Sequence, residues 1–312
     1  MNDPDTPDAW ARQPLWAASG LDQQQLPPGA LYVVATPIGN AADMTLRALW
    51  VLRNADCIAA EDTRVTAPLL KRYGIRTRLV ALHRHNERGA SEKMLARLAH
   101  GERIALVSDA GTPGISDPGA VLVRAALDAG VRVIPVPGAS SLTAALSAAG
   151  LSATSVRLLG FLPPRVQARR RLMQQAAARE EGFVVFEAPH RIGQTARELA
   201  SVLPADRRVV LARELTKLYE TVVATTAGAL PQAVEAQGER GEFVIVVDGA
   251  EPAGADADAP SLDESARHWL QALAGELPAS RVAAIGAKVT GLPRQDLYKA
   301  VLALGAPAAD NS

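Results

Sequence analysis

The chain has 312 residues, with 33 basic and 33 acidic side chains, and its 48% hydrophobic content includes only 4% aromatic residues. Such a composition is typical of a globular protein with room for two main domains and a small appendage, and its single cysteine, Cys57, excludes an internal disulfide and a multi-cysteine zinc site. Apolar runs stay short of the roughly 20 residues that span a bilayer, and the N-terminus lacks the basic and apolar regions of a signal peptide, so we expect a cytoplasmic protein that contacts no membrane.

The charges are distributed unevenly along the chain. Residues 30–250 carry 27 Lys and Arg against 21 Asp and Glu, a net charge of +6, and nearly all of these bases are arginines. Acids dominate the two ends, with five acids and no base in residues 251–264. Because arginine suits bidentate phosphate recognition, the central part is compatible with nucleic-acid binding.

Residues 1–28 are rich in Pro, Asp and Gln and show no sustained hydrophobic period, which predicts a disordered tail. Beyond them, short apolar runs alternate with helical patterns. The runs are LYVVAT (31–36), DCIAA (56–60), RIALVSD (103–109) and VRVIPV (131–136). This alternation predicts a parallel sheet in an N-terminal α/β domain, residues 29–137.

The pattern changes after residue 137, where five strand candidates follow with fewer helices between them. They are VRLLGF (156–161), GFVVFEA (182–188), RRVVLAR (207–213), ETVVATT (220–226) and GEFVIVV (241–247). They predict a second, mixed sheet in a C-terminal α/β domain, residues 138–250. Residues 251–262 resemble an acidic linker, and residues 263–312 predict a small domain of three short helices, with Ser280 in an N-cap region.

Glycine and proline gather in loops at the ends of the predicted parallel strands, where α/β sheets bind ligands. The loop from Asp109 to Gly119 holds three glycines and two prolines in eleven residues. Glycine lets a ligand approach the backbone and proline restricts the loop, so we expect a rigid wall suited to a flat, uncharged nucleoside. The turns at 36–40 and 136–141 are similar, and in the second turn Ser140 or Ser141 either caps the next helix or faces the ligand.

Polar clusters also end predicted strands, at residues 61–64, 82–87, 187–191 and 213–217. His83 and His85 alternate as a metal-binding pair would, but no third ligand is suitably spaced, so we expect no metal site. The densest basic run, Arg165 with Arg169–Arg171, is explained equally well by a solvated helix face and by phosphate contacts.

Taken together, these segments resemble one known family. The motifs are LYVVATPIGN, AAEDTR, LHRHNE, VSDAGTPGISDPG, VPGASS, FLPPR, EAPHRI, ARELTKLYE and GEFVIVV, in this order from residue 31 to residue 247. They are similar to the ribosomal RNA small subunit methyltransferase I family of the tetrapyrrole methylase superfamily, whose small helical domain the C-terminal segment also resembles. The resemblance implies two α/β domains with S-adenosyl-L-methionine in the cleft between them, a homodimer, and methylation of the ribose 2′-oxygen of a cytidine in the decoding region of 16S rRNA.

The resemblance also implies which residues contact the cofactor, mainly through the backbone. They are Pro37, Asp109, Ala110, Gly111, Ile115, Ser116, Gly138, Ala139 and Ser140. Substrate choice then falls to the second domain. Its candidate RNA-binding residues are Arg165, Arg169, Arg170, Arg171 and Arg191.

Methyl transfer from a sulfonium mainly requires alignment of the 2′-oxygen and removal of its proton. Alignment contributes on the order of 7–11 kcal/mol, and a general base contributes ~10²- to 10⁴-fold in rate. The candidate bases are Asp62, His83, His85 and Glu214. We favour Glu214, because it ends a predicted strand of the second domain beside Lys217.

Two alternative functions remain at this stage. One is a tetrapyrrole C-methyltransferase, against which the arginine-rich FLPPR segment and the helical C-terminus argue. The other is a nucleic-acid-binding regulator with a helix-turn-helix at the C-terminus and a ligand-sensing α/β part. Residues 265–312 carry only five Lys and Arg against three acids, which is few for a DNA-binding module.

Overall fold

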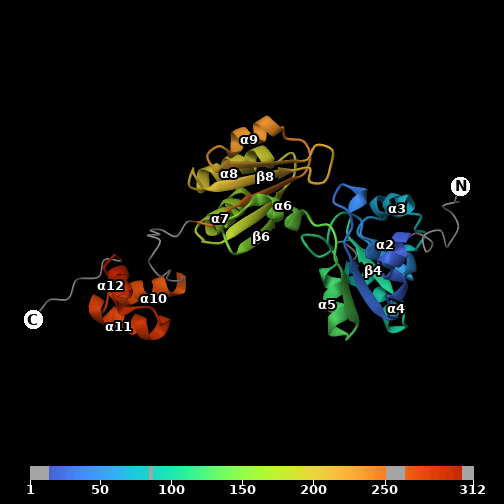
Figure 1. The fold of residues 1–312 in the computed structure, drawn as a ribbon, viewed down its shortest axis with the longest axis horizontal. Coiled ribbons are helices and arrows are strands. Elements are labelled where there is room, and N and C mark those ends of the chain that lie inside the picture. Colours follow the sequence, from blue (N-terminus) through green and yellow to red (C-terminus); the bar gives the residue numbers. More distant parts are fainter. Residues whose placement is uncertain (1–13, 84–86, 251–263, 304–312) are drawn as a thin grey trace, which may run out of the picture. The chain divides into compact units, whose positions relative to one another are not determined.

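The computed structural model describes residues 14–83, 87–250 and 264–303 (Figure 1). The chain divides into two compact units, Met1–Gly249 and Ala250–Ser312. Within the described residues, no helix is both long and apolar enough to cross a membrane.

The first sheet of the larger unit is entirely parallel, as predicted, with the strand order β3-β2-β4-β1-β5. Its strands are β1 (Ala30–Val34), β2 (Cys57–Ala60), β3 (Leu79–Ala81), β4 (Ile104–Val107) and β5 (Arg132–Val136), and its helices are α2 (Leu46–Asn54), α3 (Thr63–Arg72), α4 (Glu87–Ala99) and α5 (Ala120–Asp128). Every residue of β2 and β4 is buried. Helices α2 and α3 pack on one face of the sheet and α4 and α5 on the other, so the central strands are apolar throughout.

The segment before β1 differs from its prediction as a disordered tail. Residues 14–28 include a short helix, α1 (Pro14–Ala18), and the 3-10 turn η1 (Leu21–Gln23). Trp16 and Leu21 are 8% and 2% exposed and join the core that α2 forms with the sheet. Each large apolar side chain contributes roughly 1.5–3 kcal/mol on burial, which helps to order a segment without any hydrophobic period. Residues 1–13 lie outside the described residues.

The second sheet is mixed, and all five predicted strands are confirmed. The strand order is β6-β7-β10-β8-β9, with β6 (Val156–Phe161), β7 (Gly182–Glu187), β8 (Arg208–Arg213), β9 (Thr221–Thr226) and β10 (Phe243–Val247). Helices α7 (Val166–Ala177), α8 (Ile192–Val202) and α9 (Leu230–Gln237) pack on one face, and α6 (Ser141–Ala149) packs on the other. Ile38, from the turn after β1, also packs against the α6 side, so the two sheets share one continuous body.

The smaller unit contains the three predicted helices, α10 (Glu264–Ala274), α11 (Ala279–Thr290) and α12 (Arg294–Ala303). Its own apolar core includes Leu270, Val282 and Leu297. The prediction that Ser280 lies in an N-cap region is wrong, because Pro278 occupies the N-cap and Ser280 lies inside the first turn of α11. The helix begins at Ala279 because Ala279 and Val282 pack into the core. Proline suits the N-cap position before them because it has no backbone N–H group that needs a partner.

Candidate active site

Three loops meet at the carboxyl edge of the first sheet, after β1, β4 and β5. Thr36 and Gly111 exchange two backbone hydrogen bonds, of 2.9 and 3.0 Å, which join the loops after β1 and β4. Thr112 Oγ1 donates to the carbonyl oxygen of Ala139 at 3.1 Å and so joins the loop after β5. These bonds make the three loops one rigid floor.

The close approach of these loops requires glycine at two positions. Gly111 has a φ of +77°, and a Cβ there would lie 3.3 Å from Cγ2 of Ile38. A Cβ at Gly138 would lie 3.0 Å from the Cβ of Ala35. Ser116 also has a positive φ, of 66°, a conformation that a serine adopts only at a cost, and such strain is often found at functional sites.

A cavity of about 300 Å³ lies between this floor and the second sheet. That volume is at the lower end of the range for small-molecule sites. The floor contributes Ile38, Ala110, Gly111, Thr112, Ile115, Ser116, Asp117, Ser140 and Ser141, and the second sheet and its loops contribute Phe161, Phe186, Glu187, Ala188, Pro189, Leu215, Glu242, Phe243 and Val244. The charged lining residues are Asp117, Glu187 and Glu242, all acidic. Glu187 is paired with Arg191 and Glu242 with Lys217, and the lining residues offer no basic side chain to a phosphate.

Five of the nine cofactor-binding candidates line this cavity: Ala110, Gly111, Ile115, Ser116 and Ser140. The other four lie beside it. Pro37 is buried, Asp109 Oδ1 accepts the amide of Asp62 at 2.9 Å, and Gly138 and Ala139 hold the loops together. These four residues support the floor, and their contact with the cofactor stays a prediction.

The apolar wall on the second-sheet side was not anticipated from the sequence. The rings of Phe161 and Phe186 meet edge to face with centroids 5.8 Å apart, and Leu215 completes this wall. Phe161 ends β6 and begins FLPPR, Phe186 lies in β7 immediately before EAPHRI, and Leu215 follows β8 within ARELTKLYE. The position of those motifs at strand ends was the available signal, but the sequence does not tell which loops face one another.

Asp62 and His83, two of the candidate bases, lie at the ends of β2 and β3, outside the cavity lining. The Asp62 carboxylate accepts hydrogen bonds from the Arg64 guanidinium at 3.0 and 2.6 Å and from its amide at 2.8 Å, and these hold the pKa of Asp62 at about 2. Burial raises the pKa of the neighbouring Asp109. His83 is exposed, and His85 lies outside the described residues. In the described parts of the chain, no cluster of three or more His, Cys, Asp or Glu is arranged to hold a metal ion.

Glu214, the favoured base, has a carboxylate that is already engaged. Its Oε1 accepts hydrogen bonds from Lys217 Nζ at 2.8 Å and from the amide of Glu242 at 2.9 Å. Burial alone would raise the pKa of Glu214, but these two bonds outweigh it and hold the pKa below its usual value. Glu214 is not among the cavity-lining residues, although its neighbour Leu215 and its partner Glu242 are.

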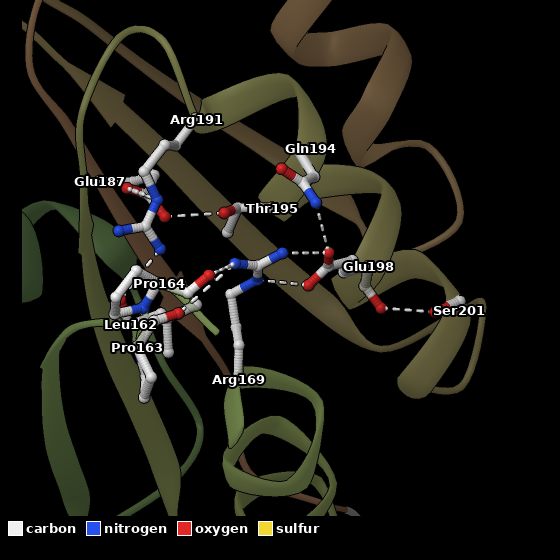
Figure 2. Close-up of polar contacts among 10 residues, drawn as sticks. All are labelled: Leu162, Pro163, Pro164, Arg169, Glu187, Arg191, Gln194, Thr195, Glu198 and Ser201. Atoms are coloured by element: carbon white, nitrogen blue, oxygen red, sulfur yellow. Dashed lines mark hydrogen bonds and ion pairs between the residues drawn. The ribbon is translucent and has the colours of Figure 1, made fainter. Parts of the chain in front are cut away.

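Two of the candidate RNA-binding arginines make structural contacts, Arg169 as a buried group and Arg191 with a side chain that is 21% exposed (Figure 2). Arg169 is 3% exposed and forms a two-pronged ion pair with Glu198, at 2.6 and 2.5 Å. Its Nη1 also donates to the carbonyl oxygens of Pro163 and Pro164. A guanidinium that is buried and bonded in this way cannot contact a phosphate of RNA. The prediction that Arg169 binds RNA is therefore wrong.

Arg191 is engaged in a similar way (Figure 2). Its Nη2 donates to the carbonyl oxygen of Leu162 at 2.9 Å, and its Nε lies 3.3 Å from Oε1 of Glu187. The Glu187 side chain is fully buried and also accepts from Thr195 Oγ1 at 2.7 Å. Arg169 and Arg191 thus fix the segment that follows Phe161, whereas Arg165, Arg170 and Arg171 are exposed.

We predict that Glu198→Ala lowers the free energy of unfolding by about 3–5 kcal/mol, because it leaves the buried Arg169 guanidinium without its carboxylate. The Arg169 hydrogen bonds lower the pKa of Glu198. This stabilisation is therefore complete above the pKa of an unfolded Glu, roughly 4.3, and is lost as the pH falls through the lower pKa of the folded state. Urea unfolding at pH 7 and at decreasing pH measures both effects. Glu235→Ala, at an exposed helical glutamate, is the control, and equal stabilities of the two variants at pH 7 would contradict the prediction.

Comparison with known proteins supports one family. A family model described as Tetrapyrrole (Corrin/Porphyrin) Methylases matches residues 30–231, and one described as RsmI C-terminal HTH domain matches residues 260–305. The protein named Ribosomal RNA small subunit methyltransferase I from Neisseria meningitidis serogroup B is 47% identical over 276 residues, which cover 88% of this chain and 93% of the relative. The protein of the same name from Escherichia coli O157:H7 is 45% identical over 276 residues, covering 88% and 95%.

Solved structures support the fold of the larger unit. A uroporphyrin-III-C-methyltransferase from Thermus thermophilus superposes with a TM-score of 0.51 at 22% identity, covering 70% of this chain and 94% of the other. A cobalt precorrin-4 methyltransferase of cobalamin biosynthesis gives 0.53 at 20% identity, covering 70% and 95%. The predicted fold class, two α/β domains of the tetrapyrrole methylase type with a helical C-terminal domain, is confirmed. The chain therefore belongs to the ribosomal RNA small subunit methyltransferase I family, within the tetrapyrrole methylases.

Proposed function

We propose that this protein transfers a methyl group from S-adenosyl-L-methionine to the ribose 2′-oxygen of a cytidine in the decoding region of 16S rRNA. The observation that carries the proposal is the cavity between the two sheets, with a floor formed by the glycine-rich loop and an opposite wall that carries Phe161, Phe186 and Leu215. We further propose that the enzyme acts in the cytoplasm as a homodimer, with the small ribosomal subunit or its rRNA as partner. The names of the relatives from Neisseria meningitidis and Escherichia coli support an rRNA substrate.

The cavity fits the chemistry of S-adenosyl-L-methionine. The cofactor supplies a methyl group that its positive sulfonium activates. Asp117 lies in the cavity floor, Glu187 and Glu242 are paired with Arg191 and Lys217, and none of the described lining residues is basic. The absence of a Cβ at Gly111 leaves the backbone accessible to a flat nucleoside. Phe161 and Phe186 supply the apolar side of the site.

We propose that the enzyme accelerates methyl transfer mainly by aligning the 2′-oxygen with the methyl group. Asp62 is a weak base since its pKa is about 2, and His83 is exposed at the end of β3. Glu214 holds the loop that carries Leu215 through its bonds to Lys217 and Glu242, so we assign it a positioning role. The exposed arginines Arg165, Arg170 and Arg171 remain the RNA-contact candidates of the second domain.

The function is tested by incubating the purified chain with labelled cofactor and 30S subunits, and in parallel with free 16S rRNA and with a porphyrinogen. We expect label in RNA, mapped by mass spectrometry to a cytidine ribose in the decoding region. Label in the porphyrinogen alone would identify a tetrapyrrole C-methyltransferase. Tight duplex binding without methyl transfer would favour the regulatory alternative.

Gly111→Ala is predicted to weaken cofactor binding by roughly 1–2 kcal/mol, because the added Cβ would lie 3.3 Å from Cγ2 of Ile38 and displace this residue of the cavity floor. The affinity should fall about 5- to 30-fold, measured calorimetrically with S-adenosyl-L-methionine alone. Gly130→Ala is the matched control, since Gly130 has a similar φ of +70° but open space around it and lies at the end of α5. Equal affinities of the two variants would refute a cofactor role for this floor.

Glu214→Gln is predicted to keep a turnover close to that of the wild type, because the amide oxygen still accepts the hydrogen bonds from Lys217 and Glu242. Glu214→Ala removes the acceptor and should lower turnover through the loop. A loss of ~10²- to 10⁴-fold in the glutamine variant would instead identify a general base. Single-turnover methylation of rRNA distinguishes these outcomes. The variants Asp62→Asn and His83→Gln, measured in the same assay, test the other two candidate bases.

A further inference from the structure

A second and larger hollow lies on the face of the first domain that α4 and α5 cover. It has a volume of about 1040 Å³. Its walls come from α4, from β3 and from the start of α5, and its charged residues are Arg78, Glu87, Arg88, Lys93, Arg97 and Glu102. We call it the α4 groove. None of these residues lines the cavity between the sheets.

The two acids of the α4 groove are already engaged. Glu102 pairs with Arg97, with Oε2 at 2.8 Å from Nε and 2.5 Å from Nη2. Oε1 of Glu87 accepts the backbone amides of Gly119 and Val121 at 2.8 and 3.2 Å, at the start of α5. Arg97 balances Glu102, and Glu87 keeps its charge but directs its carboxylate to backbone amides, so the four bases of the groove exceed its two acids.

Three cations remain, Arg78, Arg88 and Lys93, and all are exposed. Within the described residues, none of them forms an ion pair with a carboxylate. Arg88 and Lys93 lie on α4 and Arg78 immediately precedes β3, so the fold brings them to one groove from separate parts of the chain. A groove that presents unneutralised Arg and Lys suits a polyanion with regularly spaced charges.

The α4 groove lies close to the cavity along the chain. Asp117 lines the cavity and Val121 lines the groove. Four residues of chain span at most about 14 Å between their Cα atoms. Through its bonds to Gly119 and Val121, Glu87 ties the groove wall directly to the loop that forms the cavity floor. One RNA strand can therefore occupy both places with only a few nucleotides between them.

We propose that the α4 groove binds the phosphate backbone of the substrate RNA, a few nucleotides from the ribose that is methylated. This inference rests on the proposed rRNA methyltransferase function and adds an RNA-binding surface on the first domain. Contacts of this kind position the strand without reading its sequence. Arg78, Arg88 and Lys93 are the binding residues.

The test is the triple variant Arg78→Gln, Arg88→Gln and Lys93→Gln in the full chain. Loss of three phosphate contacts to a single strand lowers the slope of log affinity against log salt by about 2. Between 50 and 200 mM salt, the wild type should therefore lose about 20-fold more affinity for 16S rRNA than the variant does. The KM for 30S subunits should rise, whereas the calorimetric affinity for S-adenosyl-L-methionine and the unfolding midpoint should match the wild type.

The matched control replaces three other exposed arginines of the same unit, Arg72→Gln, Arg132→Gln and Arg179→Gln. It lowers the net charge equally, so a comparable loss of RNA affinity in the control would overturn the assignment to the α4 groove. An unchanged salt slope in the groove variant, with a wild type that methylates rRNA, would also overturn it. A groove variant that keeps its RNA affinity but changes its sedimentation would assign the groove to contacts between protein copies instead. Failure of the wild type to methylate rRNA at all would refute the proposed function itself.

Discussion

The pair of backbone hydrogen bonds between Thr36 and Gly111 is the constraint on which the site depends. It brings two loops from different strands to backbone hydrogen-bonding distance, and glycine suits position 111 because its φ there is +77°. The turn that begins with Thr36 also meets the second sheet. Ile38 packs against the core beside α6, and the amide of Asn40 donates to Oγ1 of Thr216. The floor of the cavity and the wall opposite it are thus held by the same five-residue turn.

The wall on the second-sheet side has a different constraint, set by the two prolines after Phe161. Proline has no amide hydrogen, and the carbonyl oxygens of Leu162, Pro163 and Pro164 need donors from elsewhere. Arg169 and Arg191 supply them (Figure 2). Each arginine needs a carboxylate because a buried cation without a partner is costly, and α8 and β7 provide Glu198 and Glu187. The position of an aromatic ring in the cavity therefore depends on two ion pairs behind it.

The parts of the fold that the sequence predicts well are those decided by local pattern. The buried central strands, such as β2, β4 and β10, are continuous apolar runs, and the glycine-rich loop marks its own position between β4 and α5. The failures come from residues whose environment is tertiary. Trp16 lies in a segment without periodicity and is buried in the core that α2 forms with the first sheet. Phe186 and Leu215 end strands like many other residues, and only the packing of the second sheet against the floor makes them cavity walls.

Arginine density is the least reliable of these sequence signals, for a geometric reason. Successive residues of a helix point in different directions, so the run Arg169–Arg171 cannot form one surface. Arg169 lies one helical turn before the buried Met173 and two turns before the buried Ala176, so it belongs to the core face of α7. Arg170 and Arg171 face outward. The cations of the α4 groove show the opposite case. Arg78, Arg88 and Lys93 are separated along the chain and attract no notice in the sequence, yet the packing of α4 beside β3 gathers them in one groove. A nucleic-acid surface on an α/β protein is therefore better sought from residues that share a face than from residues that share a run.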